Sequence, residues 1–190
     1  MRGDVRLLHD LVSISSPTGA TRKCAEWLAS AMRARGFREG FVDEAGNAVG
    51  VIGQGRREVL LVGHLDTVEG EIPVRLEGNV LHGRGSVDAK AALAAFIAGA
   101  ERFALDEELR IVVVGCCDEE GESLGARHVI RRYRPEAFVI GEPSGTDGIT
   151  VAYKGIVKIR YALEDDGIHT GAPFPSVPDR ALAFWSAVQG

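Results

Sequence analysis

Three short apolar runs, each of strand length and each followed by acidic or imidazole side chains, constrain the fold of this chain most. They occupy residues 59–62, 111–117 and 138–140. Continuous apolar runs of this length are typical of strands buried on both faces of a sheet. Helical segments at residues 89–103 and 123–133 separate them. This alternation predicts an α/β domain with a mainly parallel sheet flanked by helices and joined by right-handed crossovers.

The segment before the first of these runs predicts two helices and two strands. Apolar residues recur at helical spacing in residues 7–12, and Thr18 favours an N-cap for a second helix that ends at Gly36. Strands are expected at residues 37–42 and 48–52, with Gly46-Asn47 as the turn between them. Further on, Gly78-Asn79 predicts the turn of a small hairpin.

The character of the sequence changes after residue 154. Residues 157–163 alternate apolar and charged side chains, which predicts a half-exposed strand, and residues 179–188 follow Pro178 with a helical pattern. We therefore expect a catalytic, metal-binding domain at residues 1–154. A second domain would begin at residue 155 and remain incomplete at residue 190.

Composition and charge narrow the class of protein. The 190 residues are 45% hydrophobic and carry a net charge of -5, which argues against nucleic acid as a partner. The chain has no apolar run long enough for a membrane span and no signal-peptide pattern. Of the three cysteines, Cys24 stands alone and Cys116 and Cys117 are adjacent, which predicts small core residues rather than a disulfide framework. A cytoplasmic location is expected.

Four motifs carry the chemistry, and they occur in a fixed order. They are GHLDTV at 63–68, GRGSVDAK at 83–90, CDEEG at 117–121 and GEPS at 141–144. Three of them begin where a predicted buried strand ends. Because the carboxyl ends of parallel strands meet at one edge of a sheet, these side chains can converge on a single cleft. Imidazole and carboxylate groups in one cleft indicate a metal site.

The first two motifs leave alternatives open. His64 and Asp66 are alternate residues of an extended segment and face the same way, so Asp66 can orient a ligating His64. A His–Asp pair that merely ties down a turn would look the same. Asp88 ends a glycine-rich loop just before a helix, where a carboxylate can either bridge two cations or cap the helix. The glycine pattern lacks the spacing of a phosphate-binding loop.

The last two motifs favour a two-metal hydrolase. Adjacent glutamates at a turn can point differently, so Glu119 and Glu120 can serve the attacking water and a metal ion respectively. The alternative for this pair is a solvated loop, and the alternative for Glu142 is a surface acid at a strand end. Three buried strands that all end in acid or His favour the metal interpretation. His169, considered alone, is an ordinary loop histidine.

In their order and content, the four motifs resemble the di-zinc family of acetylornithine deacetylase, succinyl-diaminopimelate desuccinylase, aminoacylase and related carboxypeptidases. The resemblance extends over roughly residues 7–188. It implies a zinc-exopeptidase-like domain followed by the start of a smaller α+β lid and dimerisation domain. It also implies two divalent metal ions, zinc or cobalt, and a homodimer.

Site roles follow from the resemblance, residue by residue. It implies that one ion is held by His64, Asp88 and Glu142, and that the other is held by Asp88 and Glu120. The peptide bond after the bridging Asp88 is expected to be cis, as is frequent in the family.

The catalytic roles are implied in the same way. Glu119 would be the general base and Asp66 would orient His64. His169, in GIHTGAP at 167–173, is similar to the lid-domain histidine that reaches a neighbouring subunit's active site and steadies the oxyanion.

Shorter matches resemble the branch of the family that acts on an amino-group carrier protein. They are FVDEA at 41–45, IPVRLEG at 72–78, GAR at 125–127 and GIT at 148–150. The resemblance implies hydrolysis of an amide bond that releases lysine or ornithine from the carrier, in lysine or arginine biosynthesis. Within the family, a dipeptidase, an aminoacylase or an N-acyl-amino-acid deacetylase is the alternative.

One departure from the family pattern bears on activity. The family's second zinc gains a histidine from a late segment, and no histidine follows His169. We therefore expect this chain by itself to bind a second metal weakly and to be poorly active. An inactive fragment that only binds metal or dimerises is the alternative outside the enzymes.

Overall fold

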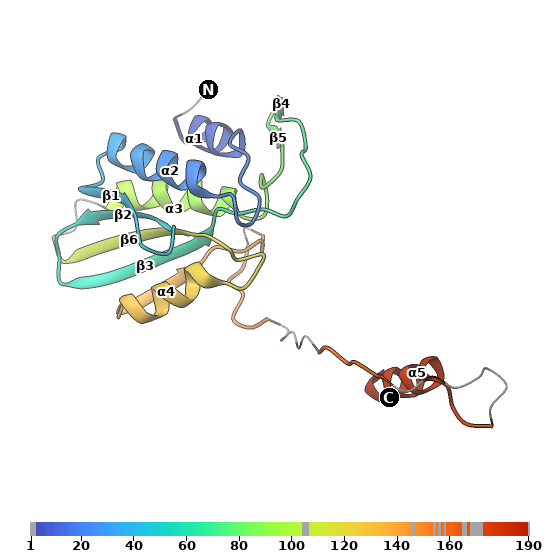
Figure 1. Ribbon diagram of the computed structural model, residues 1–190. Coiled ribbons are helices and arrows are strands. Elements are labelled where there is room, and N and C mark those ends of the chain that lie inside the picture. The colour runs from blue at the N-terminus through green and yellow to red at the C-terminus, as the bar shows by residue number, and fades with distance from the viewer. Residues whose placement is uncertain are drawn as a thin grey trace. The chain divides into compact units, whose positions relative to one another are not determined.

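The computed structural model describes residues 3–103, 107–145, 147–153, 155, 157, 159–164, 167 and 173–189. It divides into two compact units, Met1–Gly148 and Ile149–Gly190. The first unit is a layered α/β structure built around one five-stranded sheet (Figure 1). No helix in the described part of the chain is long and apolar enough to cross a membrane.

The sheet has the strand order β1-β2-β6-β3-β7. Its strands are β1 Glu39–Val42, β2 Ala48–Gly53, β3 Arg57–His64, β6 Leu109–Cys116 and β7 Ala137–Ile140. The pairs β6–β3 and β3–β7 are parallel, whereas β1–β2 and β2–β6 are antiparallel. Four of the five strands therefore run in one direction, and the predicted mainly parallel α/β sheet is confirmed. A separate hairpin of β4 Arg75–Glu77 and β5 Val80–His82 contains the predicted Gly78-Asn79 turn.

Helices cover both faces of this sheet (Figure 1). The helices α1 Gly3–Val12, α2 Arg22–Ala34 and α3 Lys90–Phe103 lie over one face, and α4 Leu124–Arg132 lies over the other. The side chains of β6 show why both faces are buried: Val113 packs with the three-helix side, and Val112 and Val114 pack with Val129 of α4. Successive strand residues point to opposite faces, so a strand between two helical layers must be apolar throughout.

One strand predicted as buried is exposed. Residues 138–140 do form β7, but Phe138, Val139 and Ile140 are 65%, 49% and 55% exposed. The reason is topological, because β7 is the last strand of the sheet and pairs only with β3. An apolar run indicates the need for burial but does not specify which element provides it.

The predicted helix boundaries are partly right. Gly36 follows α2 with a φ of +90°, the left-handed conformation expected of a helix terminator. The predicted cap, however, is wrong. The residue before α2 is Thr21, and the hydroxyl of Thr18 instead donates a hydrogen bond to Asp66 at 3.0 Å. The acceptor of the Thr18 hydroxyl lies 48 positions away, so the local sequence does not reveal it.

The second unit contains α5 Val177–Gln189, with Pro178 in its first turn as predicted. The rings of Tyr161 and Phe184 stack with their centroids 3.8 Å apart. The strand predicted at residues 157–163 is not found, because Val157 and residues 159–163 are described without strand structure. An alternating pattern produces a strand only when a partner strand accepts its hydrogen bonds.

Candidate metal centre

The ends of three parallel strands bring the predicted ligands to one edge of the sheet. His64 is the last residue of β3, residues 117–123 form a loop after β6, and Glu142 follows β7. We call residues 117–123 the acidic loop. The fourth side chain, Asp88, precedes α3, and its peptide bond to Ala89 is cis. The fold thus brings His64 together with side chains that lie between 24 positions (Asp88) and 78 positions (Glu142) further along the chain.

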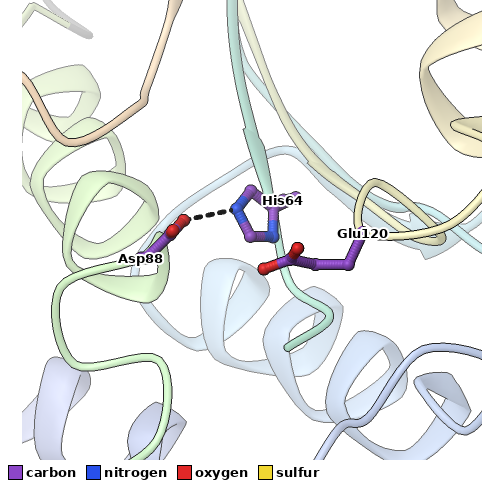
Figure 2. Close-up of side chains that lie close together, drawn as sticks. All are labelled: His64, Asp88 and Glu120. Carbon is purple, nitrogen blue, oxygen red and sulfur yellow. Dashed lines mark hydrogen bonds and ion pairs between the residues drawn. The ribbon is translucent and has the colours of Figure 1, made fainter. Parts of the chain in front are cut away.

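The centre of the site is a group of three side chains: His64, Asp88 and Glu120. One potential ligand atom from each lies within 4.8 Å of the others. The three side chains point toward one another from β3, the segment before α3 and the acidic loop (Figure 2). The Nε2 atom of His64 lies 2.9 Å from Oδ1 of Asp88. Asp88 thus pairs with the imidazole, which favours a ligand role over the helix-cap alternative.

Two further carboxylates border the same imidazole. Oε2 of Glu119 and Oε2 of Glu142 each lie 3.9 Å from Nε2 of His64. The imidazole is almost completely buried, at 1% exposure, whereas the side chains of Asp88 and Glu119 are 57% and 42% exposed. The site therefore combines a buried imidazole nitrogen with carboxylates that remain partly open to solvent.

His64 is oriented through its other ring nitrogen. Nδ1 donates to the backbone carbonyl of Asp66 at 2.9 Å, which leaves Nε2 facing Asp88. Burial lowers the pKa of His64, but hydrogen bonds to Asp66 and Asp88 outweigh burial and raise the pKa to about 10. The carboxylates around the ring therefore favour positive charge at this position. A divalent cation bound at Nε2 would supply such a charge.

The carboxylate of Asp66 binds the backbone of the acidic loop. It is fully buried and accepts the backbone N–H groups of Glu119 and Glu120, each at 3.1 Å. Burial alone would raise the pKa of Asp66, but the hydrogen bonds that it accepts lower it overall. The sequence predicts an orienting role for Asp66 toward His64. The structure adds a role toward Glu119 and Glu120, because their backbones are fixed by the same side chain.

The acidic loop turns sharply so that both glutamates face the site. Asp118 has a φ of +60°, and its carboxylate accepts the N–H groups of Glu122 and Leu124. Ser123 at the other end of the loop also has a positive φ, +56°. Non-glycine residues in this conformation are uncommon and concentrate at functional turns.

The electrostatics of the donor set fit a divalent cation. Burial raises the pKa of Glu120, and the negative charge of Asp88 adds to that effect. Burial likewise raises the pKa of Glu142, with further contributions from the charges of Glu119 and Asp88. Carboxylates resist ionisation in such a group unless positive charge is supplied. One imidazole nitrogen with several carboxylate oxygens is a donor set suited to zinc and similar ions.

A cavity of about 880 Å³ lies beside the site rather than in it. Residues 12–18 and 67–74 form most of its wall, with Arg84 and Lys90. Thr18 and Thr67 belong to this wall, and both adjoin Asp66. The ammonium group of Lys90 is buried and donates to the carbonyls of Leu11 and Ile14, so it serves to join α3 to the end of α1.

The remaining predicted site residue, His169, lies outside the described residues. Conversely, two residues that sequence reasoning did not assign to the site contribute to it. Thr18 binds Asp66, and Asn47, interpreted from sequence only as a turn residue, contacts the acidic loop. Neither carries a local signal of this role, because its partner lies 48 or 70 positions away.

Comparison with known proteins finds similar sequences. A LysW-lysine hydrolase of Deinococcus radiodurans is 46% identical over 187 residues, covering 96% of this chain and 51% of that protein. A LysW-lysine/LysW-ornithine hydrolase of Saccharolobus islandicus is 30% identical over 168 residues, covering 87% of this chain and 47% of that protein. The chain spans about half the length of the curated relatives it matches.

A solved structure shows the same fold. An M20 family metallo-carboxypeptidase from Sulfolobus solfataricus superposes with a TM-score of 0.62 at 15% identity, over 74% of this chain and 37% of that chain. The family model described as peptidase family M20/M25/M40 matches residues 60–188, which include all four motifs. The chain therefore belongs to peptidase family M20/M25/M40.

Proposed function

We propose that this chain is the metal-binding part of a divalent-metal-dependent amidohydrolase that releases lysine or ornithine from the amino-group carrier protein LysW. The observation that supports the chemistry is the convergence of His64, Asp88 and Glu120 within 4.8 Å. Similarity to proteins named for LysW-linked amino acids supports the substrate. The active enzyme acts in the cytoplasm as a homodimer, and residues 155–190 belong to its lid and dimerisation domain.

Each ligand has a role in this proposal. His64, Asp88 and Glu142 hold one ion, and Asp88 and Glu120 hold a second, with zinc or cobalt as the metal. Bound divalent ions polarise the scissile carbonyl and lower the pKa of a bound water to near neutrality. The arrangement around His64 supports this set, since Asp88 and Glu142 lie within 3.9 Å of its Nε2 atom and Glu120 belongs to the same group of side chains.

Glu119 is the general base in this proposal. Its carboxylate takes a proton from the attacking water and returns it to the leaving amine, which is the amino group of the released amino acid. Asp66 keeps this carboxylate in place through the backbone N–H of Glu119. His169, from the partner subunit's lid, donates a hydrogen bond to the oxyanion of the tetrahedral intermediate.

The test is release of free amino acid by the full-length, zinc-loaded protein. Lysine-loaded and ornithine-loaded LysW are compared with simple dipeptides and with N-acetyl-lysine. We expect release from the carrier, loss of release with a chelator, and recovery with added zinc or cobalt. Preferential cleavage of dipeptides or of N-acetyl-lysine would contradict the carrier as substrate and would support the alternative activities within the family. Bound metal without any hydrolysis would favour a purely metal-binding role.

A further inference from the structure

The turn between β1 and β2 reaches across to the acidic loop through one buried side chain. Asn47 is completely buried although it is polar and lies in a turn. Its Oδ1 atom accepts the backbone N–H of Cys117 at 3.0 Å, and its Nδ2 atom donates to the carbonyl of Gly125 at 3.2 Å. Cys117 begins the acidic loop, and Gly125 lies in the first turn of α4, just beyond the end of the loop. One carboxamide therefore joins both ends of the loop.

The position of this carboxamide is itself fixed. Nδ2 of Asn47 also donates to Oδ2 of Asp43 at 2.9 Å, and Oδ1 of Asp43 accepts the backbone N–H of Asn47 at 2.9 Å. The side chain of Asp43 is only 6% exposed. The amide of Asn47 thus uses its acceptor and both donors, and its orientation has no equivalent alternative.

The fit between the turn and the loop is close. A Cβ atom added to Gly125 would lie 2.3 Å from Oδ1 of Asn47 and 2.5 Å from the carbonyl oxygen of Cys117. The Sγ atom of Cys117 also donates to the carbonyl of Ala45 at 3.0 Å. The loop is therefore held in its middle by Asp66, from the segment after β3, and at its ends by Asn47, from the turn before β2.

We propose that Asn47 is a positioning residue for hydrolysis: by joining the two ends of the acidic loop, it keeps Glu119 and Glu120 at the metal centre. Its side chain bonds to the backbone of Cys117 and Gly125 and to Asp43, and it acts through the backbone of the loop. Because the loop residues Asp118 and Ser123 have positive φ, the loop needs such restraints to keep its conformation. The inference rests on the proposed function for its catalytic consequence, whereas its structural consequence can be measured without turnover.

The test compares Asn47→Ala with Asn79→Ala, an exposed asparagine in the β4–β5 turn, in the full-length protein. The rate of amide hydrogen exchange at residues 117–125 is expected to rise roughly tenfold or more in Asn47→Ala, whereas the exchange rates in the strands of the sheet stay unchanged. Zinc affinity is expected to fall about tenfold, because Glu120 is less well placed. With lysine-loaded LysW as substrate, kcat is expected to fall by about 10- to 100-fold, whereas KM is expected to change by less than about threefold in either direction. Asn79→Ala leaves all of these values unchanged.

Three outcomes would overturn the inference. One is that hydrogen exchange at residues 117–125 is the same in Asn47→Ala as in the wild type. Another is that Asn47→Ala keeps the kcat of the wild type, provided that the wild type releases lysine. The third is exchange that rises equally throughout the first unit, which would mean that Asn47 serves only general stability. If Asn47→Ala does not fold, Asn47→Ser, whose short hydroxyl cannot reach both loop ends, is measured in the same way. If the wild type releases no lysine, the proposed function fails. The measurements of hydrogen exchange and of zinc affinity then still decide whether Asn47 positions the loop.

Discussion

Single side chains in this site act more through the backbone than through direct contact with one another. Asp66 is the main example, because its two oxygens accept the N–H groups of Glu119 and Glu120 while its own carbonyl orients His64. A carboxylate with these partners cannot be replaced by its amide, since an NH₂ group would face a donor. Loss of one such buried contact costs the desolvation of the group left unpaired.

Asp66→Asn is therefore expected to lower the free energy of unfolding by about 1–3 kcal/mol. The variant also weakens zinc binding, because the loop that carries Glu120 is no longer held. Urea denaturation and zinc titration measure the two effects. Glu71→Gln, at an exposed acid, is the control and shifts neither value by more than about 0.5 kcal/mol. A stability equal to wild type would mean that the loop does not depend on Asp66.

Glu119→Gln separates the proposed general base from the proposed metal ligands. The amide keeps the size of the side chain but cannot accept a proton, so turnover falls by about 10²- to 10⁴-fold while zinc content stays nearly intact. Elemental analysis and release of lysine from LysW measure the two values on the same preparation. Glu122→Gln, at an exposed glutamate of the same loop, keeps full turnover. Near-normal turnover of Glu119→Gln with bound metal would assign the base to another residue.

Two cysteines are expected to be inert in the native state. Burial raises the pKa of Cys24, and burial raises the pKa of Cys116 to about 12. A raised thiol pKa keeps the group protonated until the pH approaches that value, so both remain unreactive thiols between pH 7 and 9. Iodoacetamide at pH 8 should label neither residue in the native protein and both in urea, as peptide mapping by mass spectrometry would detect. Rapid native labelling of either one would show that its segment opens readily.

At the scale of elements, the sheet depends on close backbone contacts that admit no side chain. Gly53 ends β2 with a φ of +80°, and a Cβ there would lie 2.3 Å from the carbonyl oxygen of Leu109 in β6. Gly99, in the middle of α3, has nothing within 4 Å of the same position. The same substitution therefore meets opposite conditions at the two sites.

Gly53→Ala is expected to destabilise the protein by about 1–2 kcal/mol from its left-handed backbone, and more from the contact with Leu109. Gly99→Ala is expected to stabilise it by about 0.5–1 kcal/mol, because alanine is the better helix former. Chemical denaturation of both variants beside wild type measures the difference. Equal effects of the two substitutions would contradict the conformational argument.

At the scale of the whole molecule, every described candidate for metal binding lies in the first unit, Met1–Gly148. Metal binding should therefore stabilise that unit by mass action, since the proposed ligands come from four separate segments that are together only in the folded state. At free zinc of about 100 times its dissociation constant, the gain is about 2.7 kcal/mol.

Calorimetry of the full-length protein with increasing zinc is expected to show a rising Tm that a chelator reverses. His64→Ala should abolish the rise, whereas His82→Ala, at the β4–β5 hairpin, should leave it intact. A zinc-dependent Tm that persists in His64→Ala would place the ion elsewhere.

The sequence by itself determined most of the elements, and it predicted where the candidate ligands lie along the chain. Apolar runs predict β3, β6 and β7, turn residues predict the hairpin, and Gly36 predicts the end of α2, because each depends on neighbours within a few residues. His64, Glu119, Glu120 and Glu142 could be proposed as one site because parallel strands end at the same edge of a sheet. That rule needs only the order of the strands.

Only the tertiary structure decided which groups hold the site together and which surfaces are covered. Thr18 could cap a helix, but its acceptor is Asp66, and Asn47 could simply turn the chain, but it binds Cys117 and Gly125. The exposure of β7 likewise depends on its place at the edge of the sheet. The physical reason is common to all three: these contacts join segments tens of residues apart, so no local pattern in the sequence specifies them.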